Sequence, residues 1–440
     1  CLVTRRTSAV NPSESSRLMS RPTSRSFAAT RADHGTVRRN NLSLIVRTLR
    51  DAGPRSRARL AAETGLNKAT VSSLVAELVD RGLVDEGEMQ REGVVGRPGQ
   101  IVGLNGQRVA GIGLELNVDY VAVIALSLRG DTLVSERLPL DAPNIGPERV
   151  LDGMAVLLAE VVATLEADDV VTAGVTVAIP GLMDVDRGVL TYAPNLGWRD
   201  VPVVEALAER LGREDIAIRV DNDANLSALA EYADGADAGT ADLVYLTGEV
   251  GVGGGVIVHG ELLRGADGFS GEVGHMPLDA AGHPCGCGRR GCWETMVGLG
   301  ALLRMVADVE DPVRNPELDL EQRLDLLHDR ATAGDAPTLE ALQRIGRGLG
   351  VGASILVNVF NPGVIVLGGY FAVLGEFLLE PMTDELRDHV IAGAPCRVSL
   401  SHLGFTAAAR GGAHVALDAI LSDPTLVPLL QPQRGASANR

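Results

Sequence analysis

Three of the five cysteines in this 440-residue chain lie within eight residues, in the segment CGCGRRGC. Cys285, Cys287 and Cys292 alternate with glycines, which allow a backbone to turn tightly enough for three thiolates to converge. His275, ten residues upstream, can supply a fourth ligand. Three thiolates and one imidazole form the donor set of a closed, tetrahedral zinc site, which stabilises a loop instead of activating water.

A disulfide or a set of inert buried cysteines is the alternative to a metal site. A disulfide leaves one thiol over and gives the histidine no role, and outside this segment the chain has only Cys1 and Cys396. The sequence therefore favours zinc, with the ligands His275, Cys285, Cys287 and Cys292. Glu272 and Glu294 flank these ligands, and they either face a common pocket or lie on the surface as solvated carboxylates.

The net charge of −17 is unevenly distributed along the chain. Residues 1–110 hold 18 basic against 10 acidic residues, whereas the remainder is strongly acidic. A basic head is expected to meet a polyanion, and an acidic body is not. No apolar run reaches the roughly 20 residues of a membrane span, and no secretory signal is expected. Few cysteines and a thiolate–metal site indicate the reducing cytoplasm.

Three helices are predicted over residues 40–50, 56–65 and 67–82, where apolar side chains recur at helical spacing. The second and third begin with a capping Ser or Asn, and Gly65 ends the second. Two helices joined by such a short turn form a helix-turn-helix. The start of the third helix lies where a recognition helix contacts base edges and phosphates. The candidate contacts there are Asn67, Lys68, Thr70, Ser72 and Ser73.

Residues 83–105 are predicted to form two short strands around a glycine-rich tip, which is a wing. Arg91 and Arg97 lie at that tip, where an arginine can enter a minor groove. A three-helix bundle without a role in DNA binding would not explain this wing. The combination of helix-turn-helix, wing and local positive charge predicts binding to operator DNA.

From residue 106 onward, buried strands alternate with helices, which indicates an α/β body. The clearest strand segments are residues 110–128, 170–181, 216–223, 243–258 and 363–370.

Four motifs together resemble the ROK family of sugar kinases and sugar-responsive repressors: CGCGRRGCWE with its upstream GEVGH, VDNDAN, GVGGG and VIVLGG. The resemblance covers residues 109–416, and the N-terminal segment resembles the winged helix of the repressor branch. It implies a winged helix-turn-helix followed by a two-lobed, actin-like (ribonuclease H-like) sugar-kinase fold with the sugar in the cleft. The expected divisions are a disordered basic arm (1–37), a DNA-binding domain (38–105), a sugar-binding domain (106–422, with the zinc loop 271–294) and a flexible tail (423–440).

The resemblance also assigns sugar contacts. Asp223 corresponds to the carboxylate that takes a proton from the sugar hydroxyl in the kinases, and Asn222 to a contact for sugar hydroxyls. Capping of the helix that begins near Ala224 is an alternative role for both residues, and the two roles are compatible.

On the zinc loop, Glu272 and Glu294 match carboxylates that accept hydrogen bonds from the sugar. His275 matches a residue that binds zinc through one ring nitrogen and faces the sugar with the other. Asn195 lies where the family lines the opposite side of the cleft. A neutral sugar offers many donors, so acceptors of this kind suit it.

The two phosphate-binding turns of the kinases are altered in this chain. Glu115-Leu-Asn-Val-Asp119 replaces an Asp-x-Gly-Gly-Thr turn, and Glu249 and Val250 replace the first Gly and Thr of a second, glycine-rich turn. Without these glycines, backbone amides cannot approach phosphate closely, and the added carboxylates repel it. Because phosphoryl transfer depends on positioning and charge neutralisation, a working kinase is not expected.

These observations predict a sugar-responsive transcriptional regulator, a repressor of genes for carbohydrate uptake or catabolism. It is expected to hold zinc, to lie in the cytoplasm, on the nucleoid when bound to DNA, and to act as a homodimer or homotetramer. One alternative is an ATP-dependent, glucokinase-like sugar kinase with a DNA-binding head. Another is a constitutive DNA-binding protein whose body only dimerises.

Overall fold

The computed structural model describes residues 34–90, 99–266, 268–315, 318–391 and 396–430. The predicted basic arm up to residue 33 and the wing tip with Arg91 and Arg97 therefore lie outside the described residues. By its internal contacts the chain divides into residues 1–38 and 39–440, and the second unit contains every element discussed below except the first residues of α1. Among the helices of the described ranges, none is both long and apolar enough to span a membrane.

The N-terminal part of this unit is a winged helix, as predicted. Its helices are α1 (His34–Ala52), α2 (Arg57–Thr64) and α3 (Lys68–Asp80), and its sheet has the order β1-β3-β2, with β1 (Arg55–Ser56), β2 (Val84–Gln90) and β3 (Gly99–Leu104). The expected caps are present, because Ser56 accepts from the Arg59 amide and Asn67 from the Thr70 amide. The first helix begins at His34, earlier than the predicted residue 40, because apolar periodicity does not detect a polar first turn.

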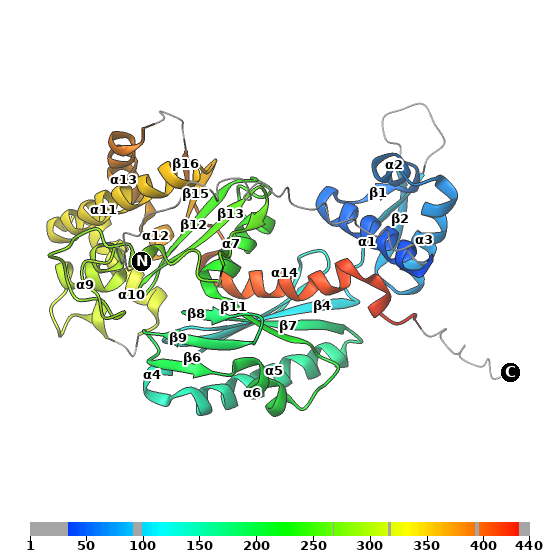
Figure 1. Ribbon diagram of the computed structural model, residues 1–440, viewed down its shortest axis with the longest axis horizontal. Helices are drawn as coiled ribbons and strands as arrows, with labels where there is room; N and C mark the ends of the chain where they lie inside the picture. Colours follow the sequence, from blue (N-terminus) through cyan, green and yellow to red (C-terminus); the bar gives the residue numbers. More distant parts are fainter. Residues whose placement is uncertain (1–33, 91–98, 267, 316–317, 392–395, 431–440) are drawn as a thin grey trace, which may run out of the picture. The chain divides into compact units, whose positions relative to one another are not determined.

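The first lobe of the body is built on a five-stranded sheet of order β11-β7-β4-β5-β6. Figure 1 shows α5 and α6 on one face of this sheet and α14 on the other. The elements are β4 (Val109–Leu116), β5 (Tyr120–Ser127), β6 (Thr132–Pro139), α4 (Ala142–Ile145), α5 (Pro147–Ala167), β7 (Val171–Ile179), α6 (Val203–Leu211) and β11 (Ile218–Asn222). A small antiparallel sheet follows β7 and consists of β8 (Leu182–Asp184), β9 (Val189–Ala193) and β10 (Trp198–Val201).

The second lobe has its own five-stranded sheet, of order β14-β13-β12-β15-β16. Its strands are β12 (Leu243–Gly248), β13 (Val252–Val258), β14 (Glu261–Leu262), β15 (Val364–Gly369) and β16 (Arg397–Leu400). Its helices are α8 (Glu294–Val297), α9 (Leu299–Val306), α10 (Leu320–Thr332), α11 (Ala336–Phe360), α12 (Tyr370–Val373) and α13 (Gly375–His389). Short 3-10 turns are η1 (Val273–His275), η2 (Pro312–Arg314) and η3 (Gly404–Thr406).

Each lobe contains one of the two tryptophans. Trp198 is buried in the core of the first lobe, and Trp293 in that of the second. The Trp293 indole lies directly against Gly352, where an added Cβ would approach a ring atom to 2.1 Å, and its Nε1 donates to the Gly348 carbonyl at 2.8 Å. Trp293 follows Cys292 in the chain, so this contact fixes the end of the loop 271–294 to helix α11.

Two helices, α7 (Asp223–Asp234) and α14 (Ala407–Ser422), pack with almost no side chain between their backbones. A Cβ on Gly411 would lie 1.9 Å from the Leu226 carbonyl oxygen, and one on Gly113 of β4 would lie 1.7 Å from that of Ala409. Such distances leave no room for anything larger than glycine. Helix α14 is therefore held directly against α7 and against the sheet of the first lobe.

The C-terminal segment differs from the flexible tail expected from residue 423. Residues 423–430 include the 3-10 turn η4 (Pro424–Leu426), and Val427 is fully buried in a core cluster that contains residues of α1, α3 and α14. Burial of Val427 and hydrogen bonds to the winged helix hold this segment in place. Residues 431–440 lie outside the described part of the chain.

Candidate functional site

A pocket of about 490 Å³ lies at the ends of strands from both lobes and beside the loop 271–294. The carboxyl ends of β7 and β11, the turn between β12 and β13, and the loop 271–294 supply its walls. Every candidate sugar-binding residue lines it: Asn195, Asn222, Asp223, Glu272, His275 and Glu294. The structure thus brings together side chains from three distant parts of the sequence, and Glu272 and Glu294 face one pocket.

Asn222 and Asp223 occupy the junction between β11 and α7. The Asn222 side chain caps α7 by accepting from the Asn225 amide at 3.1 Å, and its Nδ2 donates to the Gly181 carbonyl at 3.1 Å. The capping role is therefore present, and Asn222 still lines the pocket. Burial raises the pKa of Asp223 to about 6, although the Ala224 amide opposes this shift by donating a hydrogen bond. With this pKa, Asp223 is mostly ionised at neutral pH and accepts hydrogen bonds there. It becomes protonated as the pH falls through 6.

Residues beside these were not predicted from the sequence. Arg264 donates two hydrogen bonds to the buried Asp221, at 3.1 and 2.6 Å, and so fixes the end of β11. Tyr192 and Phe269 also line the pocket, and Phe269 is 43% exposed. Phe269 lies two residues before the GEVGH motif in a chain with only 3% aromatic residues, and this position is the signal that could have identified it.

The four predicted metal ligands converge. One ligand atom from each of His275, Cys285, Cys287 and Cys292 lies within 4.8 Å of all the others. Cys287 Sγ and Cys292 Sγ are 3.7 Å apart, and Cys285 Sγ is 3.6 Å from His275 Nδ1. A disulfide needs about 2 Å between sulfurs, so these cysteines are not bonded to each other. Zinc–sulfur bonds of about 2.3 Å in a tetrahedron place two sulfurs just under 4 Å apart, so the group can hold a metal ion.

The remaining nitrogen of His275 faces the pocket side. Its Nε2 lies 3.8 Å from Glu272 Oε2, while its Nδ1 faces Cys285. Glu294 accepts a hydrogen bond from Cys285 Sγ at 2.8 Å, so this carboxylate contacts the metal cluster as well as the pocket. Burial, with smaller contributions from the charges of Asp223 and Glu294, raises the pKa of Glu272 to about 7. The loop therefore presents two acceptors next to the cluster.

Of the residues expected at the two predicted phosphate turns, some line the same pocket and others do not. Asn117 and Glu249 line it, and the Asn117 amide donates a hydrogen bond to the Glu249 carboxyl. Glu115, expected to face phosphate, is only 2% exposed and accepts from Tyr120 Oη at 2.6 Å. It lies on β4, which is covered on both faces, so its side chain is directed into the protein. Asp119 does not line the pocket either.

Burial raises the pKa values of both glutamates. That of Glu249 rises to about 8 and that of Glu115 to about 7, and the charges of neighbouring carboxyls add to the effect. Glu249 is thus held largely protonated at neutral pH. A largely protonated carboxyl is thus paired with an amide in the wall of the pocket.

The candidate DNA contacts lie at the first turns of α3. Asn67, Lys68 and Ser73 are exposed, whereas Thr70 and Ser72 are half-buried. Asn67 also caps the helix, so its side-chain oxygen is already used. Lys68 is the one cation among these five residues and stands at the start of the helix.

Comparison with known proteins agrees with this architecture. Residues 111–419 match the ROK family, and residues 43–93 match the MarR family. The xylose repressor of Bacillus subtilis strain 168 is 31% identical over 398 residues, which cover 90% of this chain and 99% of the repressor. A glucokinase of Halalkalibacterium halodurans is 33% identical over 250 residues, or 54% of this chain and 74% of the kinase.

A crystal structure described as a ROK family transcriptional regulator, homolog of the E. coli MLC protein, has the same fold. It superposes with a TM-score of 0.69 at 23% identity, covering 88% of this chain and 97% of that one. Winged helix and two-lobed body together define the class of sugar-kinase-like proteins with a DNA-binding head. The chain belongs to the ROK family.

Proposed function

We propose that the chain is a sugar-responsive transcriptional repressor without kinase activity. The head over residues 38–105 binds operator DNA, and the body over residues 106–422 binds a sugar in the pocket between its lobes. The observation that carries this proposal is the pairing of a winged helix with a pocket lined by acceptors, Asp223, Glu272 and Glu294, in one chain. The similarity to the xylose repressor over nearly its whole length supports it.

The sugar is held by acceptors and by one aromatic ring. Asp223, Glu272 and Glu294 offer carboxyl oxygens that accept hydrogen bonds from sugar hydroxyls. Asn195 and Asn222 contribute amides, and the free ring nitrogen of His275 faces the same space. Phe269, exposed at the pocket, offers an apolar face for the C–H side of a sugar ring.

Zinc is the proposed metal of the His275 cluster. Three thiolates and an imidazole are soft donors in a closed set, which suits structural zinc. The ion would hold the loop 271–294 so that Glu272 and Glu294 keep their positions, and it would have no open coordination site for catalysis. The protein's own contribution is the tight loop and the Trp293 contact that fixes its end.

On the DNA side, the first turns of α3 enter the major groove. Lys68 contacts a phosphate, and the small polar residues Asn67, Thr70, Ser72 and Ser73 approach base edges. Arg91 and Arg97 of the wing are proposed to reach a minor groove. A two-fold assembly reads two half-sites, so the protein acts as a homodimer or homotetramer in the cytoplasm, on the nucleoid when it is bound to DNA.

One experiment tests the proposal in both parts. The purified protein is titrated onto genomic DNA fragments upstream of carbohydrate-uptake genes, with and without xylose, glucose or N-acetylglucosamine. We expect specific binding to at least one fragment and a change of about tenfold in affinity with one of the sugars. Absence of specific DNA binding, or DNA binding that no sugar changes, would contradict the proposal.

The second candidate function is a sugar kinase with a DNA-binding head. The raised pKa of Asp223, which is the position of the catalytic base in the kinases, and the similarity to a glucokinase favour it. The Asn117–Glu249 pair speaks against it, because it occupies the place of a phosphate-binding turn. Phosphorylation of any of the three sugars by ATP would establish the kinase.

A further inference from the structure

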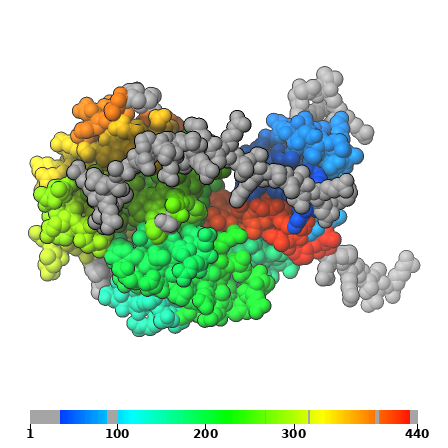
Figure 2. Space-filling model, in the orientation of Figure 1, coloured from blue at the N-terminus to red at the C-terminus, as the bar shows by residue number. Residues whose placement is uncertain are grey.

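The winged helix and the body share one hydrophobic core. Apolar residues of α1, α2 and α3 lie in the same buried cluster as residues of β4, β5 and α14, among them Leu417, Ile420 and Leu421. In Figure 2 the C-terminal segment, in red, lies directly against the head, in blue. A cavity of about 1270 Å³ opens beside this core, lined by α1 and β2 on one side and by α7 and α14 on the other. The head is therefore joined to the body through this shared core, and an open cavity lies beside the junction.

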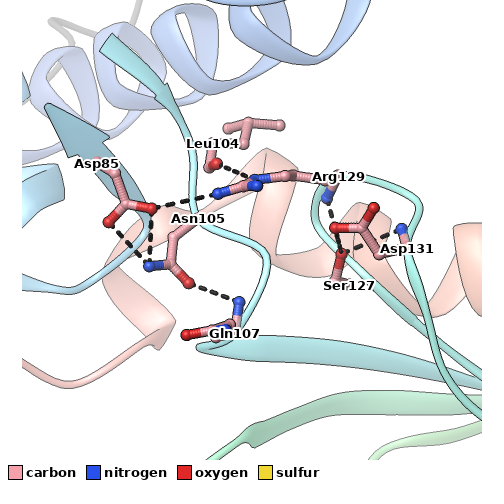
Figure 3. Close-up of polar contacts among 7 residues, drawn as sticks. All are labelled: Asp85, Leu104, Asn105, Gln107, Ser127, Arg129 and Asp131. Atoms are coloured by element: carbon pink, nitrogen blue, oxygen red, sulfur yellow. Dashed lines mark hydrogen bonds and ion pairs between the residues drawn. The ribbon is translucent and has the colours of Figure 1, made fainter. Parts of the chain in front are cut away.

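The polar contacts on one side of the junction are mostly exposed, and the Arg129–Leu104 hydrogen bond is half-buried. Figure 3 shows Asn105 donating to Asp85, and Arg129 donating to the Leu104 carbonyl at 2.7 Å and approaching Asp85 at 3.5 Å. The Arg129 and Asp85 side chains are both 51% exposed. Exposed pairs of this kind contribute little to stability, so they cannot by themselves fix the orientation of the head.

The contacts on the C-terminal side involve α14 and the segment after it. Ser43 Oγ donates to the Leu421 carbonyl at 2.7 Å, and Arg47 donates to Asp418 at 2.9 Å and to Ser422 at 2.7 Å. These contacts join α1 to the last turns of α14. They hold α1, the first helix of the head, for which no DNA contact is proposed.

Arg81 makes the contact that reaches the recognition helix. It is the C-cap residue of α3, and its side chain pairs with Glu77 of the same helix, both only about 15% exposed (14% and 15%). Its Nη1 donates to the carbonyls of Val427 at 2.6 Å and Thr425 at 3.2 Å. The Leu430 amide donates back to the Asp80 carbonyl at 2.8 Å. One half-buried guanidinium thus ties the end of α3 to the segment 423–430.

Helix α14 connects this segment to the sugar pocket. At its N-terminal half, Arg410 and His414 both contact Asp234, at 3.1 and 2.7 Å, and Asp234 is the last residue of α7. The first residue of α7 is Asp223, in the pocket. Because Gly411 allows the backbones of α7 and α14 to touch, a displacement of α7 has no intervening side chains to absorb it.

We propose that Arg81 is a positioning residue: it fixes the recognition helix to the segment 423–430, so that occupancy of the pocket at Asp223 is transmitted through α7 and α14 to operator binding. This inference rests on the proposed function. The inference adds a route of regulation to that function. It also assigns a role to Arg81, for which no contact with sugar or DNA is proposed. A ligand can shift the equilibrium between two arrangements of the head only if it binds one of them more tightly. The contacts from Asp223 through α7, α14 and the segment 423–430 to Arg81 would couple the sugar affinity of the pocket to the arrangement of the head.

The test compares two truncations and two double variants. Deletion of residues 424–440 removes the acceptors of Arg81, whereas deletion of residues 431–440 removes none of the contacts described here. Glu77→Gln/Arg81→Gln breaks the link without leaving a lone charge, and Arg57→Gln/Glu86→Gln removes a similar ion pair that lies wholly inside the head. For each, operator affinity is measured with and without the sugar, among xylose, glucose and N-acetylglucosamine, that most raises the melting temperature of the wild type.

We expect the sugar to change operator affinity by about tenfold or more in the wild type and in both controls. In the 424–440 deletion and in Glu77→Gln/Arg81→Gln, this ratio should fall to less than about twofold, while the Kd for sugar stays within about twofold of the wild type. A merely structural role would lower sugar affinity or melting temperature together with the ratio. If Glu77→Gln/Arg81→Gln keeps the wild-type ratio, the inference is wrong, even where the longer truncation fails to fold.

A second readout does not depend on the ligand. Amide hydrogen exchange at the last turn of α3 should be several-fold faster in Glu77→Gln/Arg81→Gln than in Arg57→Gln/Glu86→Gln. Equal exchange would show that the segment 423–430 does not hold the helix. A wild type that binds neither sugar nor operator would instead overturn the proposed function. The exchange result would still show whether Arg81 and the segment 423–430 hold the end of α3.

Discussion

Asn117 and Glu249 stand on turns of different lobes, and the Asn117 amide donates a hydrogen bond to the Glu249 carboxyl where both line the pocket. The contact joins the β4–β5 turn to the β12–β13 turn directly. The Asn117–Glu249 hydrogen bond is thus a direct polar contact between the two lobes.

The first prediction concerns nucleotide. Millimolar Mg-ATP should change the melting temperature of the protein by less than about 1 °C, because a ligand that does not bind the folded state cannot stabilise it. A recognised sugar should raise it by several degrees in the same assay. A comparable rise with ATP alone would show that the phosphate site still functions.

The second prediction concerns the metal. We expect about one zinc ion per chain. Cys287→Ser should lose most of it, lower the melting temperature and weaken sugar binding at least tenfold, because loss of one metal ligand releases the loop 271–294. Cys396→Ser, at a half-buried cysteine outside the cluster, is the matched control and should keep its metal. Metal content is measured by atomic emission. Full sugar affinity in a metal-free Cys287→Ser protein would refute the role of the ion.

The third prediction concerns pH and sugar binding. The Asp223 carboxylate accepts hydrogen bonds only when ionised, and its pKa is raised to about 6. Glu272 lines the same pocket with a pKa raised to about 7, so sugar affinity should begin to fall near pH 7. It should fall further as the pH is lowered through 6, where Asp223 contributes up to tenfold per pH unit. Calorimetry between pH 5 and pH 8 would follow this change. Asp223→Asn should bind more weakly at pH 8 and lack the step near pH 6, and a step that survives in this variant would assign it to another group.

The fourth prediction concerns pH and stability. The pKa of Glu115 is raised from 4.5 to about 7 in the folded protein, mainly by burial. Below pH 4.5 the carboxyl is protonated in both states and costs nothing. Between 4.5 and about 7 it ionises only in the unfolded state, so the wild type loses up to about 1.4 kcal/mol of stability per pH unit, and the loss levels off above 7.

Glu115→Gln cannot ionise, so its free energy of unfolding relative to the wild type should rise with pH over this window. Urea denaturation at pH 5, 6, 7 and 8 measures the difference, and its slope with pH is the readout. The same substitution at the exposed Glu160 on α5 is the control. A flat difference across the window would mean that Glu115 is not held protonated by the fold.

The fifth prediction concerns DNA. Lys68→Ala should weaken operator binding about tenfold at low salt and reduce the slope of log affinity against log salt by about 1, because one phosphate contact is lost. Sugar affinity should not change. Arg187→Ala, at a 75% exposed arginine of the body, removes the same charge and should leave the salt slope as it is. An unchanged slope in Lys68→Ala would show that this lysine does not contact DNA.

Several parts of the fold and site could be predicted because their signal is local. The caps at Ser56 and Asn67, the wing strands and the cysteine spacing each depend on a few neighbouring residues. Family resemblance then placed Asp223 and the zinc loop beside one pocket, which periodicity alone could not do, because pairing between distant strands leaves no mark in a single sequence.

Other parts depended on packing that the sequence does not reveal. Glu115 was assigned to the phosphate side by its position in a turn, but α14 and α5 cover both faces of its strand and leave it only Tyr120 as a hydroxyl partner. The segment 423–430 is too short for periodicity, so the burial of Val427 gave no signal. The Arg264–Asp221 pair joins residues 43 positions apart and was missed for the same reason.

The burial of one tryptophan in each lobe has a practical consequence. The chain holds two indoles, one buried in each lobe, and one of them directly follows a cysteine of the metal cluster. Intrinsic fluorescence is therefore a label-free reporter already built into both halves of the body. With Trp198→Phe the emission comes from Trp293 alone, and with Trp293→Phe it comes from Trp198 alone. The spectroscopist can thus learn which half rearranges first when a carbohydrate arrives.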